Sequence, residues 1–149
     1  QQLAHLCKSI YHYPQMNEPL KSFALHQGPL IVYALLIFGA SSLPRIPAPD
    51  VGIDYLDKLL HAAAYALFAL AAVRAAKRWH KVLSNNTIYL IIICFLLSAV
   101  YAASDEYHQS FVPGRSADIN DFYADLFGII LALSAYVVCT FYKAWTHRT

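Results

Sequence analysis

The chain has 149 residues, of which 58% are hydrophobic and only 13% are charged. A water-soluble domain of this length carries about a quarter charged residues, so much of the molecular surface must face something other than water. The net charge of +2 is small, and no basic stripe with interleaved aromatic residues accompanies it, which argues against nucleic acid as a partner.

Four apolar stretches follow one another along the chain, at residues 25–43, 59–73, 87–104 and 126–142. None contains Asp, Glu, Lys or Arg, and each approaches the roughly 20 residues that a helix needs to cross a bilayer. No apolar–polar alternation of period two is visible, which excludes strands. The sequence therefore predicts an all-α integral membrane protein, a four-helix bundle over residues 21–149. Residues 1–20 are expected to be a leader or an expression remnant, peripheral to the bundle.

Charged and polar residues border the last three stretches and are needed to bring each helix to full length. They are Asp57 and Lys58 before the second stretch, Asp105, Glu106 and Gln109 after the third, and Asp118, Asp121 and Asp125 before the fourth. Charges at such positions are costly, and they face a bundle interior or a wet cavity. The connections are predicted to be a proline-rich break at 44–49, a basic turn at 74–86 and a tight turn at 112–115.

The distribution of lysine and arginine predicts how the bundle sits in the membrane. One side collects Lys8, Lys21, Arg74, Lys77, Arg78, Lys81, Lys143 and Arg148, and the other holds Arg45, Lys58 and Arg115. The first side, which includes both termini, is therefore predicted to be cytoplasmic. The opposite side carries most of the acids, namely Asp50, Asp54, Asp57, Asp105, Glu106, Asp118, Asp121 and Asp125. A polar cluster is thus expected at the outer end of the bundle.

Helical spacing gathers these polar residues on three helix faces. Asp57, His61 and Tyr65 are each four residues apart on the second predicted helix, so they share one face. The corresponding faces of the fourth and third helices carry Asp118, Asp121, Asp125 and Gly128, and Tyr101, Asp105 and His108 with Glu106 and Gln109 alongside. The predicted site brings His61, Asp105, Glu106 and Asp125 near one another, under the turn that holds Arg115.

Such a group of carboxylates predicts bound cations or bound protons. Several carboxylates in a place of low dielectric constant must bind cations, pair with Lys58 and Arg115, or keep their protons. The second and fourth helices also point their N-termini at the site, and helix N-termini favour anions. Together with Arg115 they would suit a phosphate or carboxylate headgroup, bridged by a divalent cation on Glu106, Asp125 and Asp105.

Several of these residues also have a purely structural interpretation. Aspartate is favoured at helix caps, and capping is the favoured interpretation of Asp57 and Asp118. Arg115 could pair with Asp118 or Glu106 and hold the turn in place. Glu106 and Asp125 resist this interpretation, because they stand where the burial of a charge costs most.

One segment of the chain resembles a known family. The run Ser104-Asp105-Glu106-Tyr107-His108-Gln109-Ser110-Phe111-Val112-Pro113-Gly114-Arg115-Ser116, followed by Asp121, Asp125 and Gly128, is similar to the signature of VanZ-like membrane proteins. The upstream Asp57, Lys58, His61 and Tyr65 match as well, and the resemblance covers most of the chain. It implies a bacterial protein of the inner membrane. The namesake of the family is associated with resistance to the glycopeptide antibiotic teicoplanin, and members often carry Asn where this chain has Asp125.

The first functional hypothesis is an enzyme that acts on a lipid-linked or cell-envelope substrate at the outer leaflet. Glu106, Asp125 and Asp105 would bind a divalent cation or act as general base, His61 would shuttle protons, and Arg115 would hold an anionic headgroup. The further candidates for binding are His108, Gln109, Asp121, Asp57 and Lys58.

Two other hypotheses stay open. The cluster could bind cations, envelope precursors or an antibiotic without turnover; transport would then require an oligomer, because four short helices leave little room for a path. Alternatively the charges could form a structural ion network, with His61 as a buried hydrogen-bonding histidine. The first two hypotheses are favoured, because the acids outnumber Lys58 and Arg115.

Overall fold

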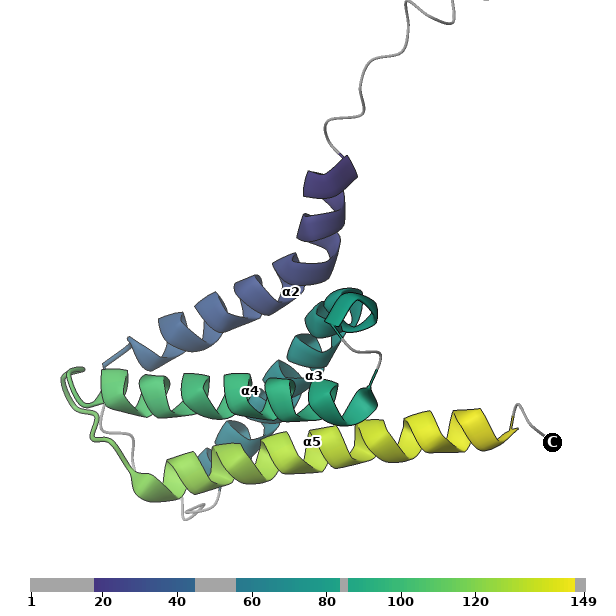
Figure 1. Cartoon of the computed structure of the whole chain (residues 1–149). Coiled ribbons are helices and arrows are strands. Elements are labelled where there is room, and N and C mark those ends of the chain that lie inside the picture. The colour runs from purple at the N-terminus through teal and green to yellow at the C-terminus, as the bar shows by residue number, and fades with distance from the viewer. Residues whose placement is uncertain (1–17, 45–55, 84–85, 147–149) are drawn as a thin grey trace, which may run out of the picture.

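The computed structural model describes residues 18–44, 56–83 and 86–146, and nearly all of them are helical (Figure 1). The helices are α2 (Glu18–Ser41), α3 (Leu56–Leu83), α4 (Thr87–Gln109) and α5 (Ile119–Thr146). No strand occurs in these described segments, and all four helices are long and apolar enough to cross a membrane. The predicted all-α, four-helix membrane architecture is therefore confirmed.

The helices extend beyond the apolar stretches, mostly through charged residues. Helix α2 begins at Glu18, ahead of the predicted domain start at residue 21. The predicted basic turn at 74–86 is wrong, because α3 continues to Leu83. Lysine and arginine are good helix formers and their long side chains can reach the interface from a helix end, so they lengthen this helix. Residues 1–17 and 45–55, with Arg45, Asp50 and Asp54, lie outside the described part of the chain.

The helices are arranged so that four helix ends meet at one end of the bundle. Figure 1 shows α4 and α5 running antiparallel, with α3 crossing behind α4 and α2 along the edge of the bundle. The ends of α2 and α4 therefore lie near the starts of α3 and α5. This region is called the polar end below, because most of the buried polar side chains belong to it.

Helices α3 and α5 approach each other closely because α5 carries a glycine at their contact. A Cβ atom built on Gly128 would lie 2.0 Å from the backbone oxygen of Ala62 on α3. Tyr65 and Ala69 of α3 and Ile129 of α5 are fully or almost fully buried beside this contact. Lipid provides no hydrophobic force between helices, so small residues that let two backbones approach supply the van der Waals contact that holds them together.

Helix α2 contains Pro29, and Figure 1 shows this helix bent, with its N-terminal part turned away from the other helices. Proline has no backbone N–H, so the carbonyl of Leu25, four residues earlier, loses its helical partner. Arg74 of α3 donates to that carbonyl at 3.0 Å. Nearer the polar end, the hydroxyl of Tyr33 donates to the carbonyl of Ala64 at 3.2 Å. Hydrogen bonds to backbone carbonyls thus attach both parts of α2 to α3.

A tight turn connects α4 to α5, as the sequence predicted. The N–H of Arg115 donates to the carbonyl of Val112 at 3.1 Å, and Gly114 has a φ of 77°. Proline at the second position and a glycine of positive φ at the third are typical of a type II turn. Because the following residues lead directly into α5, this turn places Arg115 over the ends of α2 and α4.

Candidate functional site

The centre of the polar end is a group of three side chains from three helices. His61 of α3, Glu106 of α4 and Asp125 of α5 each offer an atom suited to a metal ion, and these atoms lie within 4.8 Å of one another. Asp125 is completely buried, and its Oδ1 lies 3.0 Å from Nδ1 of His61. These three residues are called the central triad below. All three were among the candidates predicted from the sequence.

Two buried carboxylate oxygens of the central triad have no hydrogen-bond partner among the described residues. They are Oε1 of Glu106 and Oδ2 of Asp125. The other oxygen of Glu106 accepts the backbone N–H of Asp118 at 3.1 Å. A buried oxygen without a hydrogen-bond partner lowers the folding stability by roughly 1–3 kcal/mol, and a charged oxygen lowers it by more. The two atoms therefore mark a place where a further hydrogen-bond donor or a cation would be stabilised.

The nearest basic side chain that carries a permanent charge is committed to other acids. Lys58 of α3 donates to Oδ2 of Asp118 at 2.8 Å and also to Asp121. Asp118 in turn accepts the backbone N–H of Asn120 at 2.9 Å, so it caps α5 as predicted. The bond from Lys58 holds the pKa of the Asp118 carboxyl below its usual value, because the ammonium stabilises the carboxylate. Lys58 therefore offsets the charge of two acids at the rim of the site. His61 is then the basic side chain that remains beside the carboxylates of the central triad.

A second group of possible cation ligands adjoins the central triad. Asp57, His61 and Asp121 offer atoms within 4.8 Å of one another, and His61 belongs to both groups. Asp57 lies in the first turn of α3, and Asp121 is buried in the first turn of α5. Since Lys58 already bonds to Asp121, its ammonium supplies positive charge to this second group.

Asp105 belongs to a neighbouring hydrogen-bond network. Its Oδ2 accepts the Ser41 hydroxyl of α2 at 2.9 Å and the side-chain amide of Gln109 at 3.2 Å. Its Oδ1 is buried and has no hydrogen-bond partner in the described segments. Asp105 was predicted to share a cation with Glu106 and Asp125, but it is in neither group of three ligands. It joins α4 to the end of α2 instead.

Arg115 makes contacts that the sequence did not predict. Three of its five N–H groups donate to the carbonyl of Leu43, to the carbonyl of Ala40 and to the side-chain oxygen of Gln109, at 3.0, 3.1 and 3.1 Å. Among the described residues it makes no ion pair with Asp118 or Glu106, the two acids that the structural interpretation of Arg115 named as its possible partners. The last carbonyls of a helix lack intrahelical partners, and Arg115 donates to one of those in the last turn of α2, that of Ala40, and to the carbonyl of Leu43 just after the helix.

His108 also attaches the end of α2 and lies apart from the central triad. Its Nε2 is 3.0 Å from the hydroxyl of Ser42, and its ring stacks on Phe38 with centroids 4.5 Å apart. Ser41 and Ser42 were not among the site residues predicted from the sequence, although both contact polar residues of α4. Two hydroxyls at the end of an apolar helix were the signal available in the sequence, because that end faces the polar end of the bundle.

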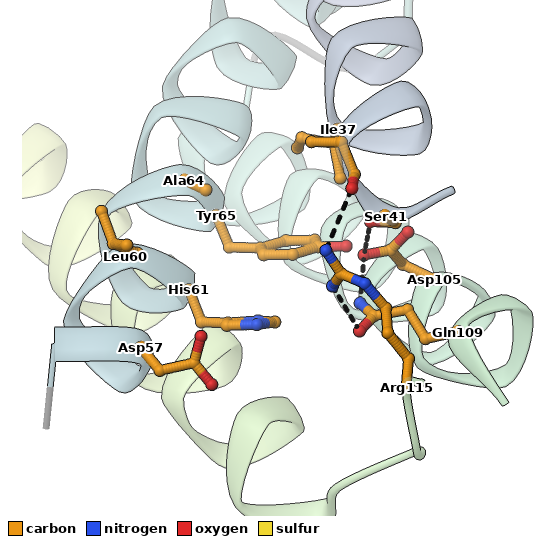
Figure 2. Close-up of a pocket in the computed structure, with 11 residues that line it drawn as sticks. Ile37, Ser41, Asp57, Leu60, His61, Ala64, Tyr65, Asp105, Gln109 and Arg115 are labelled. Carbon is orange, nitrogen blue, oxygen red and sulfur yellow. Dashed lines mark hydrogen bonds between the residues drawn. The ribbon is translucent and has the colours of Figure 1, made fainter. Parts of the chain in front are cut away.

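A pocket of about 250 Å³ opens between α2 and α3 at the polar end (Figure 2). Ile37, Leu60 and Ala64 form its apolar part, and its polar part includes Asp57, His61, Tyr65, Asp105, Gln109 and Arg115. Figure 2 shows the rings of His61 and Tyr65 pointing from α3 in the same direction, toward the side where Asp105 and Arg115 lie. His61 therefore connects this pocket, called the α2–α3 pocket below, to the central triad.

A second pocket reaches the central triad from another side. It has a volume of about 410 Å³ and is lined by Ala103, Glu106, Ala117, Asp118, Ile119 and Phe122. Asp118 lies in the segment that leads into α5, and Glu106 lies beneath it in α4. The triad is thus between two pockets, with His61 on one side and Glu106 on the other. A small ion could approach Glu106 without passing through the α2–α3 pocket.

Comparison with known proteins gives one match. A family model described as VanZ/LLP1 matches residues 6–141, which includes α2, α3, α4, most of α5 and every residue of the polar end. No curated protein and no solved structure matches the chain.

Proposed function

The chain belongs to the VanZ/LLP1 family of multi-pass membrane proteins, and we propose that it acts on an anionic, lipid-linked substrate of the bacterial cell envelope. The reaction centre is the central triad, His61, Glu106 and Asp125, with a divalent cation as its cofactor. The protein resides in the inner membrane with both termini in the cytoplasm, so that the polar end opens at the outer leaflet, as the distribution of lysine and arginine predicts.

The observation that carries this proposal is the charge of the central triad. Two buried carboxylates have only the imidazole of His61 between them, and each keeps one oxygen without a partner in the described chain. Lys58 is bonded to two other acids, and Arg115 is bonded to Gln109 and to α2. Buried carboxylates need a compensating positive charge or a proton, so a cation would stabilise this arrangement.

The donor set favours a small divalent ion. One imidazole and two carboxylates are ligands for Zn²⁺, and carboxylate-rich sites also suit Mn²⁺. Ligand atoms about 2.1 Å from one ion are about 3–4 Å apart. The 3.0 Å between Nδ1 of His61 and Oδ1 of Asp125 already fits, and the other pairs lie within 4.8 Å, so Glu106 needs at most a small inward movement.

The residues around the ion would then take separate roles. A bound divalent ion can polarise a phosphoryl or carbonyl oxygen or lower the pKa of a bound water. Glu106, which also lines the second pocket, would accept a proton as general base. His61 borders the α2–α3 pocket, and the ring nitrogen that does not hold the ion would donate a hydrogen bond to the substrate. The N–H groups of Arg115 that make no bond to the described protein would hold the anionic headgroup of the substrate.

A structural network is the second candidate function of the polar end, and hydrogen bonds favour it for the half of the polar end that lies beside α2. Arg115, His108 and Asp105 all bond to the last residues of α2, so this half fixes the helix in place. The central triad makes no comparable bond to α2. Binding of an envelope precursor or an antibiotic without turnover would use the same pocket, and a chemical assay would separate it from catalysis.

Thermal unfolding of the purified protein in detergent tests the proposal. A ligand that binds only the folded state raises the unfolding midpoint, so Mn²⁺ or Zn²⁺ should raise it in the wild type, and EDTA should reverse the effect. Glu106→Gln should abolish this response. Asp105→Asn is the matched control, because it removes a buried charge from the adjacent residue, outside the triad, and should keep the response.

Two results would contradict the proposal. One is an unfolding midpoint that no divalent cation changes while Glu106→Gln is strongly destabilised, which would make the triad a structural network. The other is a cation response that Asp105→Asn abolishes and Glu106→Gln leaves intact, which would move the ion to the network beside α2.

A further inference from the structure

The α2–α3 pocket has a floor formed by a hydrogen bond between the two helices. The Tyr33 hydroxyl of α2 donates to the Ala64 carbonyl of α3 at 3.2 Å. Ile37 comes one helical turn after Tyr33, and Leu60 comes one turn before Ala64, and both line the pocket. The pocket therefore begins directly above this bond and continues toward the polar end.

The polarity of the lining changes along the pocket in the direction of the helix axes. Next to the floor the lining is apolar, with Ile37, Leu60 and Ala64. One further turn toward the polar end it becomes polar, with Ser41 on α2 and Asp57 on α3. Arg115 limits the pocket at this upper level, where it bonds to the end of α2. This change of the pocket lining from apolar to polar follows the order of a bilayer from its core to its surface.

The mouth of the pocket faces the lipid side of the bundle. Leu60 lines the pocket and yet has an exposed fraction of 60%, so its side chain stands at the boundary between the pocket and the surroundings. In a helix that crosses the membrane, that exposed surface meets acyl chains. The polar interior of the pocket is thus accessible from the bilayer, past Leu60, between two attachments of α2.

Two polar atoms inside the pocket are buried and make no hydrogen bond of ordinary geometry in the described segments, and the Tyr65 hydroxyl lies near enough to the Asp105 carboxylate to interact with it. The Tyr65 hydroxyl belongs to a side chain that is 1% exposed, and Oδ1 of Asp105 to one that is 5% exposed. Both line the pocket, and Figure 2 shows the Tyr65 ring directed toward Asp105 and Arg115. Arg115 has two further N–H groups beyond its three bonds to the protein. Together these groups offer donors to an oxyanion and an acceptor to a hydroxyl.

We propose that the substrate is a phosphate-bearing amphiphile that enters the α2–α3 pocket sideways from the bilayer. Its hydrocarbon chain lies against Ile37, Leu60 and Ala64, and its phosphate lies between Tyr65, Arg115 and His61. The protonated phosphate oxygen or a headgroup hydroxyl donates to Asp105. The proposal rests on the proposed function, because the phosphate would be bound beside the cation of the central triad that is to act on it.

Thermal unfolding in dodecyl maltoside, with dodecyl phosphate as the probe, tests this substrate class. Dodecyl phosphate should raise the unfolding midpoint of the wild type by about 3 °C or more. Leu60→Trp, which fills the mouth, should abolish this shift. Leu59→Trp is the matched control, because Leu59 is similarly exposed (64%) and does not line the pocket. It should keep the shift.

Two further probes separate the sources of the effect. Inorganic phosphate and dodecanol should each produce little or no shift, because one lacks the chain and the other the charge. An equal shift with inorganic phosphate would mean that the anion arrives from water, and an equal shift with dodecanol would mean that no headgroup is recognised. Either result would overturn the proposal. So would the absence of a shift with dodecyl phosphate, or an equal loss in Leu59→Trp and Leu60→Trp.

The response to Mn²⁺, measured in separate samples, distinguishes failure here from failure of the proposed function. Leu60 is not a ligand of the central triad, so Leu60→Trp should respond to Mn²⁺ as the wild type does. A retained Mn²⁺ response without any dodecyl phosphate response would support the cation centre and contradict the proposed lipid pocket. The reverse pattern would keep the pocket and remove the cation centre.

Discussion

Gly128 determines how closely α3 and α5 can pack, and so how near Asp125 comes to His61. The backbone oxygen of Ala62 occupies the place that a methyl group on Gly128 would need. Asp125 lies one turn before Gly128 on α5, and His61 immediately precedes Ala62 on α3. The 3.0 Å contact between the two side chains therefore depends on the glycine as well as on their own chemistry.

Replacement of this glycine should separate the two helices. Gly128→Ala is expected to destabilise the detergent-solubilised protein by about 3 kcal/mol, because overpacking against backbone cannot be relieved by a side-chain rotation. It should also weaken the response to Mn²⁺. Gly39→Ala is the control: no atom lies within 4 Å of its added methyl group, so helix propensity should make it neutral or stabilising by up to about 1 kcal/mol. Equal effects in the two variants would contradict the close packing of α3 and α5.

Asp118 and Lys58 form a charge pair whose pH dependence follows from the lowered pKa of Asp118. A carboxyl with a lower pKa in the folded state stabilises the fold above its unfolded pKa, and this stabilisation disappears as the pH falls through the folded value. The loss should therefore occur below the usual aspartate value of 3.8. Nuclear magnetic resonance titration of the Asp118 carboxyl should show this low pKa, and Lys58→Met should raise it. A titration that Lys58→Met leaves unchanged would show that the pair is not formed.

At the scale of the element, α2 is the helix whose position depends most on polar contacts. Arg115 and His108 hold its last residues, and Tyr33 and Arg74 hold its middle and its bend. The partner of Arg115, Tyr33 and Arg74 is in each case a backbone carbonyl. The partner of His108 is the Ser42 hydroxyl. Since the α2–α3 pocket lies between two of them, the strength of these attachments decides whether the pocket keeps its shape.

Arg115→Lys should loosen the end of α2 while it preserves the charge. A lysine cannot reach three acceptors in the fixed fork geometry of a guanidinium, so the variant should lose about 1–2 kcal/mol. Amide hydrogen exchange should become faster at residues 37–43. Arg74→Lys, the same change at the bend, should leave exchange at 37–43 unaffected. An Arg115→Lys variant with unchanged exchange in that segment would mean that the turn does not hold α2.

The sequence predicted the helices well and their ends less well, for a physical reason. Apolar stretches near the length of a bilayer indicate helices by themselves, and α4 and α5 were found where hydropathy placed them. The end of α3 was missed, because residues from Arg74 onward were interpreted as a turn on charge alone, although basic residues are compatible with a helix end at the membrane surface.

The candidate site was predicted in its membership and only partly in its connections. Spacing placed His61, Glu106 and Asp125 on converging helix faces, and the structure brings them together. Spacing alone could not assign Asp105 and Glu106 to different networks. Adjacent residues on a helix point about 100° apart, and only the position of α2 decides which partner each one meets. The partners of Arg115 were missed because two of them are backbone carbonyls, which every residue carries and which therefore leave no signal in the sequence.

At the scale of the whole molecule, the polar end combines a lipid-accessible pocket with a buried anionic centre. Large apolar side chains are exposed along all four helices of spanning length. The family match includes α2, α3, α4 and most of α5, so the polar end is part of a membrane architecture and not an appended domain. The central claim is that His61, Glu106 and Asp125 bind one divalent cation.

Electron paramagnetic resonance of Mn²⁺ bound to the purified protein would show whether these three residues hold the ion. We expect one bound Mn²⁺ per chain, with a nitrogen coupling from the imidazole of His61, and loss of the bound ion in both Glu106→Gln and Asp125→Asn. Asp105→Asn should keep the ion and its nitrogen coupling. A protein that binds no Mn²⁺, or an ion without nitrogen coupling that survives both triad substitutions, would contradict the account.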